Sequence, residues 1–191
     1  MESFGFIGNR KTIDHIALKD AKDILTRGLK HFLGDNCEWL PEYDEVADWL
    51  TDNKCRGLLV FGSNGRGKTV ICTKVLPLIF KHYLKKEIYM VDATDLNAYY
   101  RNQSDNFYIT TADVPIIIDD IGVESIVSEY GDKKDLVSEI IDRSEKRNRL
   151  LIMTTNLTPT EIEERYGLRT LDRLKSIVRA IKCHGDSMRK W

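Results

Sequence analysis

A glycine-rich octapeptide at residues 62–69, Gly-Ser-Asn-Gly-Arg-Gly-Lys-Thr, constrains the fold of this sequence more than any other stretch. It follows the apolar run at residues 57–61 and precedes Val70, Ile71 and Cys72. A buried strand, a glycine loop and a helix are therefore expected in direct succession. The octapeptide fits the pattern G-x-x-x-x-G-K-[ST], in which backbone N–H groups and the start of a helix bind phosphate. This succession predicts an α/β fold with a parallel sheet.

The residue types in this loop suit a bound nucleotide. Glycines lack a Cβ, so successive N–H groups can approach phosphate oxygens closely. Lys68 would bring an ammonium group to the β- and γ-phosphates, and the Thr69 hydroxyl would be a ligand of Mg²⁺. An ordinary glycine-rich turn is the alternative, but a chance match is expected in only roughly one chain in a hundred of this length. The residues expected to bind the nucleotide are Gly62, Ser63, Asn64, Gly65, Arg66, Gly67, Lys68, Thr69 and Val70.

A second informative stretch, residues 114–122, reads Val-Pro-Ile-Ile-Ile-Asp-Asp-Ile-Gly. Its β-branched apolar residues predict a buried parallel strand, with the two carboxylates at the carboxyl end where ligands of α/β sheets bind. Splitting a nucleotide requires one carboxylate for hydrated magnesium and another to orient or deprotonate the attacking water. Asp119 and Asp120 could supply both, and an Asp-rich turn without a catalytic role is the alternative.

Residues 150–156, Leu-Leu-Ile-Met-Thr-Thr-Asn, predict a further buried strand that again ends in polar residues. Asn156 would then lie at the same sheet edge, where it could hydrogen-bond the γ-phosphate or the water. It could instead cap the next helix, although Thr158 or Thr160 with the glutamates that follow fits that role better.

Hydrophobic periodicity predicts the remaining elements. Helices are expected at residues 18–32, 43–50, 70–86, 94–100, 136–147, 159–166 and 169–176. Further strands are expected at residues 87–91 and, at the edge of the sheet, at residues 177–183. Irregular structure is expected at residues 1–17, 101–113 and 122–134. Pro77 should kink the helix that follows the glycine loop.

Composition limits the class of protein. With 191 residues, 42% hydrophobic and 31% charged, one soluble domain is expected. No apolar run reaches the roughly 20 residues of a membrane helix and no leader pattern is present, so we expect a cytoplasmic protein without membrane contact. The four cysteines are scattered, which favours neither a zinc site nor disulfides. Residues 165–191 carry eight Lys or Arg against two acids, which indicates either a phosphate-binding patch or a solvated helical face.

Together, the glycine loop, the Asp-Asp strand, the Thr-Thr-Asn strand and the terminal Gly-Asp-Ser-Met-Arg resemble the AAA+ ATPases of the DnaC/DnaI helicase-loader and IstB transposition-helper group. The resemblance covers residues 57–191. It implies a P-loop NTPase αβα sandwich with a mainly parallel five-stranded sheet, an AAA+ core without the C-terminal helical lid. Residues 1–56 would be a helical N-terminal extension packed on this core.

The same resemblance assigns roles to the motifs. Residues 62–69 look like Walker A and residues 116–120 like Walker B. Asp119 then resembles the magnesium-associated acid. Asp120 falls where many relatives have a catalytic glutamate, which is longer by one methylene.

Three more residues take roles from the resemblance. Asn156 looks like sensor 1 and Arg189 like the sensor 2 arginine. Arg173 resembles the arginine finger, which would reach the γ-phosphate on a neighbouring subunit. The expected catalytic residues are therefore Lys68, Asp120, Asn156 and Arg173.

Three functions fit these motifs. The first is a magnesium-dependent ATPase that assembles with copies of itself, with Arg173 acting in trans, and remodels a replication or transposition complex on DNA. Single-stranded DNA and a replicative helicase or transposase would be its partners. The second is a nucleoside or nucleotide kinase, whose phosphate loop has the same spacing. The third is a nucleotide-gated binding module with little hydrolysis, because Asp120 replaces a glutamate.

Overall fold

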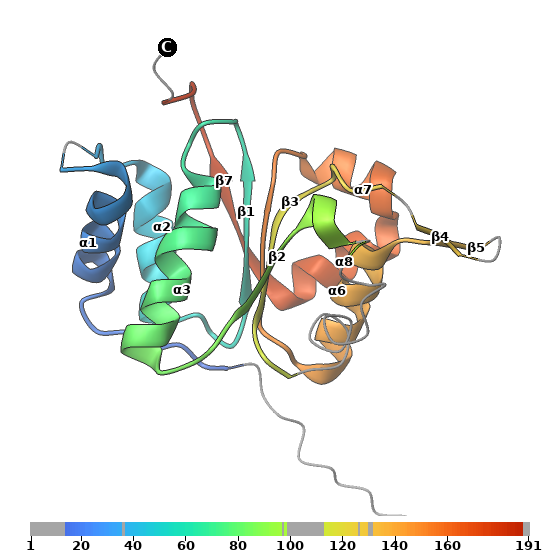
Figure 1. Ribbon diagram of the computed structural model, residues 1–191, viewed down its shortest axis with the longest axis horizontal. Coiled ribbons are helices and arrows are strands. Elements are labelled where there is room, and N and C mark those ends of the chain that lie inside the picture. The colour runs from blue at the N-terminus through green and yellow to red at the C-terminus, as the bar shows by residue number, and fades with distance from the viewer. Residues whose placement is uncertain are drawn as a thin grey trace, which may run out of the picture.

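A parallel β-sheet forms the centre of the molecule (Figure 1). The computed structural model describes residues 14–35, 37–96, 98, 113–125, 127–129 and 132–188. Five strands lie in the order β2-β3-β6-β1-β7, and each neighbouring pair runs parallel. They are β1 (Gly57–Gly62), β2 (Tyr89–Asp92), β3 (Ile116–Ile121), β6 (Leu151–Thr155) and β7 (Val178–Cys183). The predicted five-stranded sheet is confirmed, with β7 at its edge as expected.

Helices cover both faces of this sheet (Figure 1). One face carries α1 (Ala21–Leu33), α2 (Pro41–Thr51) and the helix that follows β1. The other carries α6 (Leu136–Arg147), α7 (Pro159–Tyr166) and α8 (Leu168–Ile177). This is the predicted αβα sandwich. Within the described part of the chain, no helix is both long enough and apolar enough to cross a bilayer.

Each face of the sheet has its own hydrophobic cluster. Alternate side chains of a strand point to opposite faces, so β1 contributes Leu58 and Val60 to one cluster and Leu59 to the other. Because both faces are covered, the inner strands β1, β3 and β6 read as nearly continuous apolar runs, whereas the edge strand β7 alternates between buried and more exposed residues. On the α1–α2 side, the buried indole of Trp49 donates to the carbonyl of Gly57 at 3.1 Å, which ties α2 to the start of β1.

The helix after the glycine loop continues to Leu84 but is not uniformly α-helical. Its π-helical segments η1 (Val70–Val75) and η2 (Phe80–Leu84) flank the single α-helical turn α3 (Leu76–Ile79). Pro77, where a kink was predicted, lies within this turn. A proline ring crowds the preceding turn of an α-helix, and we attribute the wider preceding segment to that crowding.

The segment 122–134, predicted to be irregular, contains a small hairpin. Strands β4 (Val127–Glu129) and β5 (Asp132–Lys134) pair antiparallel and project from the body of the molecule (Figure 1). Runs of three residues are too short to show the alternation that marks a strand, so the prediction was wrong.

One predicted helix begins more than two residues later in the structure, and another is described only in part. Helix α1 begins at Ala21 rather than residue 18, since Asp20 has a left-handed φ of 56° that interrupts a right-handed helix. The helix expected at residues 94–100 is described only as the 3₁₀ turn η3 (Ala93–Asp95) and Leu96. The rest of that segment, apart from residue 98, lies outside the described residues, as do residues 1–13 and 99–112.

Gly57 allows β1 and β6 to approach each other, and replacing it should destabilise the sheet. A Cβ at this position would lie 2.0 Å from the carbonyl oxygen of Leu151, a backbone atom that cannot rotate away. We expect Gly57→Ala to lower the free energy of unfolding by about 3 kcal/mol, seen as a melting temperature about 10 °C lower. Ala180→Gly on the exposed edge of β7 is the control and should cost about 1 kcal/mol or less. A melting temperature for Gly57→Ala equal to that of the wild type would contradict this packing.

Candidate active site

The glycine loop connects β1 to the helix that begins at Lys68 and wraps around the lysine ammonium group. Gly62 has a φ of 111°, and a Cβ there would lie 2.5 Å from the carbonyl oxygen of Cys183, so only glycine fits. The ammonium nitrogen of Lys68 donates to the carbonyls of Gly62 (2.8 Å) and Ser63 (2.9 Å) and to Oδ1 of Asn156 (2.7 Å). The side chain is thereby aimed at the carboxyl end of the sheet.

A continuous chain of polar contacts joins three of the predicted site residues. Asn156 accepts from Lys68 with its amide oxygen and donates through Nδ2 to Oδ1 of Asp120 at 2.9 Å. These residues come from the loop after β1, from the end of β6 and from β3, which are adjacent strands. The sheet therefore brings Lys68, Asp120 and Asn156 together.

A bulge in β3 places the two aspartates, and Thr154 holds it. The pairing of β3 with β6 shifts register between Ile118 and Ile121, and Asp120 has a left-handed φ of 55°. The hydroxyl of Thr154 accepts from the backbone N–H of Asp120 at 2.8 Å and donates to Oδ1 of Asp119 at 2.5 Å. Thr154 was not predicted as a site residue, although two adjacent threonines at the end of an apolar strand that is expected to be buried indicate hydroxyls with specific partners.

Burial and the negative charge of Asp119 raise the pKa of the Asp120 carboxyl above its usual value. Because the pKa of Asp120 is higher in the folded state than in the unfolded state, ionisation of this carboxyl lowers the free energy of unfolding. This loss is absent at a pH below the unfolded-state pKa, and it grows with pH until the pH passes the folded-state pKa. The left-handed backbone adds strain that asparagine tolerates better than most residues.

We therefore expect Asp120→Asn to melt at a higher temperature than the wild type near pH 7.5. The new amide oxygen can still accept from Asn156, while the charge is gone. The part of the difference in melting temperature that comes from the charge should shrink as the pH falls through the raised folded-state pKa toward about 4, and it should vanish below that, where the wild-type carboxyl becomes protonated in both states. Thermal melts of both proteins from pH 3.5 to 8 test this, and a difference that does not change with pH would contradict the charge argument.

A cavity of about 490 Å³ opens beside these residues. It is lined by Leu33, Tyr43, Asn64, Gly65, Arg66, Gly67, Lys68, Thr69, Val70, Asp120, Thr154, Asn156 and Met188. Gly62 and Ser63 line a neighbouring hollow of about 410 Å³ that shares Asn64 and Asn156. The lining thus combines the polar phosphate loop with apolar and aromatic side chains that the sequence reasoning did not assign.

The residues expected to hold magnesium suit that ion. Thr69 is exposed and lines the cavity. Asp119, 7% exposed, is not among the lining residues, but its carboxylate accepts from the hydroxyl of Thr154, which does line the cavity. Among the described residues, no three His, Cys, Asp or Glu side chains cluster as a metal cage. Mg²⁺ is ordinarily held by one or two protein oxygens, phosphate oxygens and water, so the donor set fits.

The three arginines among the predicted site residues are placed differently from one another. Arg66 lines the cavity, yet its guanidinium pairs with Glu42 of α2. Arg173 lies on α8, where its guanidinium pairs with Asp142 and Glu145 of α6, and it does not line the cavity. Arg189 lies outside the described residues.

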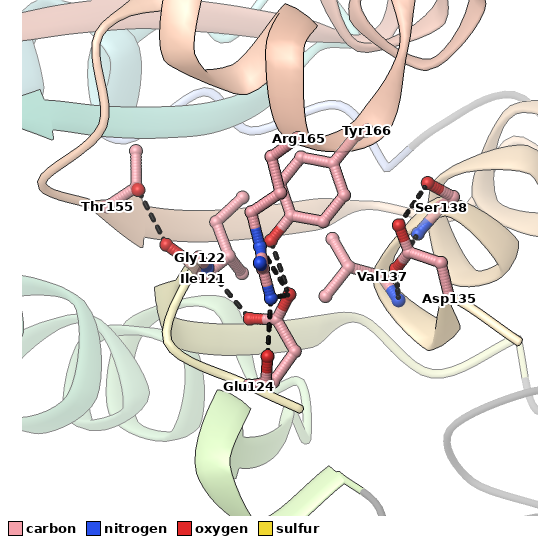
Figure 2. A network of polar contacts seen from close by, with 9 residues as sticks. All are labelled: Ile121, Gly122, Glu124, Asp135, Val137, Ser138, Thr155, Arg165 and Tyr166. Carbon is pink, nitrogen blue, oxygen red and sulfur yellow. Dashed lines mark hydrogen bonds and ion pairs between the residues drawn. The ribbon is translucent and has the colours of Figure 1, made fainter. Parts of the chain in front are cut away.

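A buried glutamate fixes the turn that follows the two aspartates (Figure 2). Glu124 accepts from the N–H of Gly122 at 2.7 Å, from the Tyr166 hydroxyl at 2.6 Å and from the Arg165 guanidinium at 3.1 Å. Burial and the carboxylate of Glu124 raise the pKa of Tyr166, so its hydroxyl stays protonated and donates. The end of β3 is thereby held to α7, a contact between distant segments that no local pattern revealed.

Solved structures of replication proteins share this architecture. The crystal structure of DnaI matches with a TM-score of 0.63 and 17% identity, over 90% of this chain and 100% of that one. The crystal structure of the DnaC helicase loader matches with a TM-score of 0.56 and 19% identity, over 88% of this chain and 93% of that one. This chain has the AAA+ fold of the DnaC and DnaI structures.

Two further matches cover less of the chains compared. The structure of AMPPCP-bound DnaA from Aquifex aeolicus matches this chain with a TM-score of 0.54 and 19% identity, over 77% of this chain and 49% of that one. The sequence profile of the nephrocystin 3 N-terminal family matches residues 35–114, less than half of the chain. No curated protein sequence matches the chain.

Proposed function

We propose that this protein binds and hydrolyses ATP with Mg²⁺ and acts as a helicase-loader-like or transposition-helper-like AAA+ factor in DNA replication. The observation that carries the proposal is the contact chain from Lys68 through Asn156 to Asp120. It brings a phosphate-binding cation, a polar amide and a carboxylate to one edge of the sheet, beside a cavity. An AMPPCP-bound DnaA among the structures of this fold supports a nucleotide as the ligand.

The cavity offers separate surfaces for the two halves of ATP. The N–H groups of residues 62–69 and the Lys68 ammonium would receive the phosphates. Leu33, Tyr43 and Met188 offer apolar and aromatic surface to the base. Thr69 and Asp119 would hold magnesium, which supplies positive charge next to the phosphate oxygens.

Asp120 would orient or deprotonate the attacking water, and Asn156 would hold that water or the γ-phosphate. The raised pKa of Asp120 makes it a better proton acceptor than an ordinary aspartate. Its side chain is nevertheless short and already accepts from Asn156. That contact also favours the second candidate, a nucleotide-gated binding module with little hydrolysis.

Phosphate release separates these candidates. We expect turnover from ATP that requires Mg²⁺ and rises with protein concentration or with single-stranded DNA. ATP binding with no turnover under any of these conditions would favour the binding module. Phosphate transfer to a nucleoside or nucleoside monophosphate instead of water would identify a kinase.

The surroundings of the site support partners on DNA. Residues 1–56 form, in this proposal, a helical extension on the ATPase core of residues 57–191. Basic residues on α8 and β7 would contact phosphates of single-stranded DNA, and one structure of this fold is DnaA bound to AMPPCP and single-stranded DNA. A replicative helicase or transposase would be the protein partner.

Arg189, which follows the last strand of the sheet in the sequence, would bind the nucleotide as the sensor 2 arginine.

Arg173 would complete the site of a neighbouring copy. Its position away from its own cavity is what a trans role requires, and it would have to exchange Asp142 and Glu145 for the γ-phosphate. We expect Arg173→Ala to reduce turnover at least about 100-fold under assembling conditions while ATP affinity stays within about threefold of the wild type. Mixing this variant with Lys68→Ala should restore part of the turnover, because one site in the mixed assembly then has both residues. Full turnover by Arg173→Ala alone would contradict the trans role.

A further inference from the structure

Arg66 stands at an unrestricted position of the phosphate-loop pattern, yet its side chain is one of the few buried cations of the described residues. Nε donates to Oε1 of Glu42 at 2.8 Å, and Nη2 donates to Oε2 at 3.2 Å. The side chains of Arg66 and Glu42 are 10% and 3% exposed. This two-point contact joins the loop to the first turn of α2.

The same region of the loop has two more anchors. The Tyr43 hydroxyl, also on α2, approaches the carbonyl oxygen of Arg66 at 3.4 Å. On the other side, Nη1 of Arg66 donates to the carbonyl of Asp186 at 3.4 Å, and the N–H of Met188 donates to the carbonyl of Gly65 at 3.1 Å. The phosphate loop is therefore held between α2 and the chain that follows β7.

A buried ion pair is a weak source of net stability, because the cost of removing two charges from water offsets most of their attraction. Its directional geometry, in contrast, fixes where the connected backbone lies. A glycine-rich loop has a large conformational entropy to lose when it closes around phosphates. A side chain that holds the loop in place before binding reduces that loss and so raises affinity.

We infer that Arg66 is a positioning residue that fastens the phosphate loop to α2 through Glu42 and thereby couples nucleotide binding to the α1–α2 region. The inference rests on the proposed nucleotide binding and adds a role for this side chain, which need not contact the nucleotide. The coupling is reciprocal: if α2 holds the loop for the nucleotide, the nucleotide must hold α2.

Side-chain contacts join α1 and α2, so a change in the position of α2 on nucleotide binding should also affect α1. Trp39 packs edge-on against Tyr43 with ring centroids 5.6 Å apart, and Lys22 of α1 lies 5.0 Å above the Trp39 ring. Lys22 also pairs with Asp44 of α2 at 2.6 Å. A change in the position of the first turn of α2 would therefore extend to α1.

Replacing both charges with apolar side chains separates positioning from stability. Arg66→Met and Glu42→Met alone each leave one buried charge unpaired and should lower the melting temperature, whereas the double variant should recover most of the loss. ATP affinity, measured by calorimetric titration, should remain at least about tenfold weaker in the double variant. The control double variant Lys22→Gln/Asp44→Asn removes an exposed ion pair between the same helices that does not touch the loop, and should bind ATP like the wild type.

Hydrogen exchange gives the reciprocal readout. ATP should slow amide exchange in α2 of the wild type and of the control, but not in the Arg66→Met/Glu42→Met variant. If that variant does not fold, Arg66→Lys replaces it, since lysine keeps the charge and loses the two-point contact; severalfold weaker ATP binding at a nearly unchanged melting temperature is expected. Wild-type affinity and wild-type protection of α2 in the folded variant would overturn the inference. A wild-type protein that does not bind ATP would instead overturn the proposed function on which it rests.

Discussion

Lys68→Ala should abolish nucleotide binding. The ammonium group of Lys68 is buried and held toward the carboxyl end of the sheet by three acceptors, where a phosphate chain would replace some of them. Removing a buried, charge-assisted contact to phosphate costs several kcal/mol. We expect ATP affinity to fall at least about 100-fold, as measured by calorimetric titration, and phosphate release to become undetectable.

The matched control for this prediction is Lys81→Ala, an exposed lysine near the far end of the same helix. It removes the same charge from the same element without reaching the cavity and should bind ATP like the wild type. Thermal melts establish that both variants are folded. Undiminished ATP binding by folded Lys68→Ala would show that the loop does not bind the phosphates.

Asp120→Asn should separate binding from hydrolysis. Asparagine preserves the size of the side chain and the contact with Asn156 but cannot accept a proton. Loss of a general base typically costs about 10²- to 10⁴-fold in rate. We expect phosphate release to fall by about that factor, while ATP affinity stays within about threefold of the wild type.

Asp48→Asn, on the exposed side of α2, is the control for loss of a carboxylate. If Asp120→Asn retains full turnover, the general-base role is wrong. If it loses ATP binding as well, Asp120 belongs to the binding contacts rather than to the chemistry. A variant that is both more stable and less active would fit a strained carboxylate kept for function.

Local pattern was sufficient for the sheet and for placing Lys68, Asp120 and Asn156 at one edge of it. Strands β3 and β6 are buried on both faces, so apolar runs ending in Asp119, Asp120 and Asn156 marked both the strands and their carboxyl ends. Parallel strands carry their carboxyl ends to one edge, which is why residues far apart in sequence could be expected together.

Most contacts that hold the site join residues that are distant in the sequence, and the sequence does not reveal which residues pair. Thr154 reaches Asp119 and Asp120 across a bulge whose register no single strand specifies. The buried carboxylate of Glu124 accepts from a hydroxyl and a guanidinium of α7, which is distant in the sequence. A sequence shows that such residues are polar, but not which partner satisfies them.

Arginines were the hardest residues to interpret from sequence. A guanidinium can donate to phosphate, to carboxylate or to backbone carbonyls with similar geometry. Arg66 was expected at the nucleotide because of the motif; it lines the cavity, and its guanidinium contacts Glu42 of α2. Arg173 remains a proposal, because its ion pairs with α6 would also suit a purely structural role.

The most direct test of the account is a titration of the wild-type protein with ATP in the presence of Mg²⁺. We predict one ATP bound per chain with a dissociation constant between about 1 μM and 1 mM, together with a higher melting temperature at saturating ATP. If ATP at several times that upper concentration produces no binding heat and no shift in melting temperature, the assignment of the cavity to a nucleotide is contradicted.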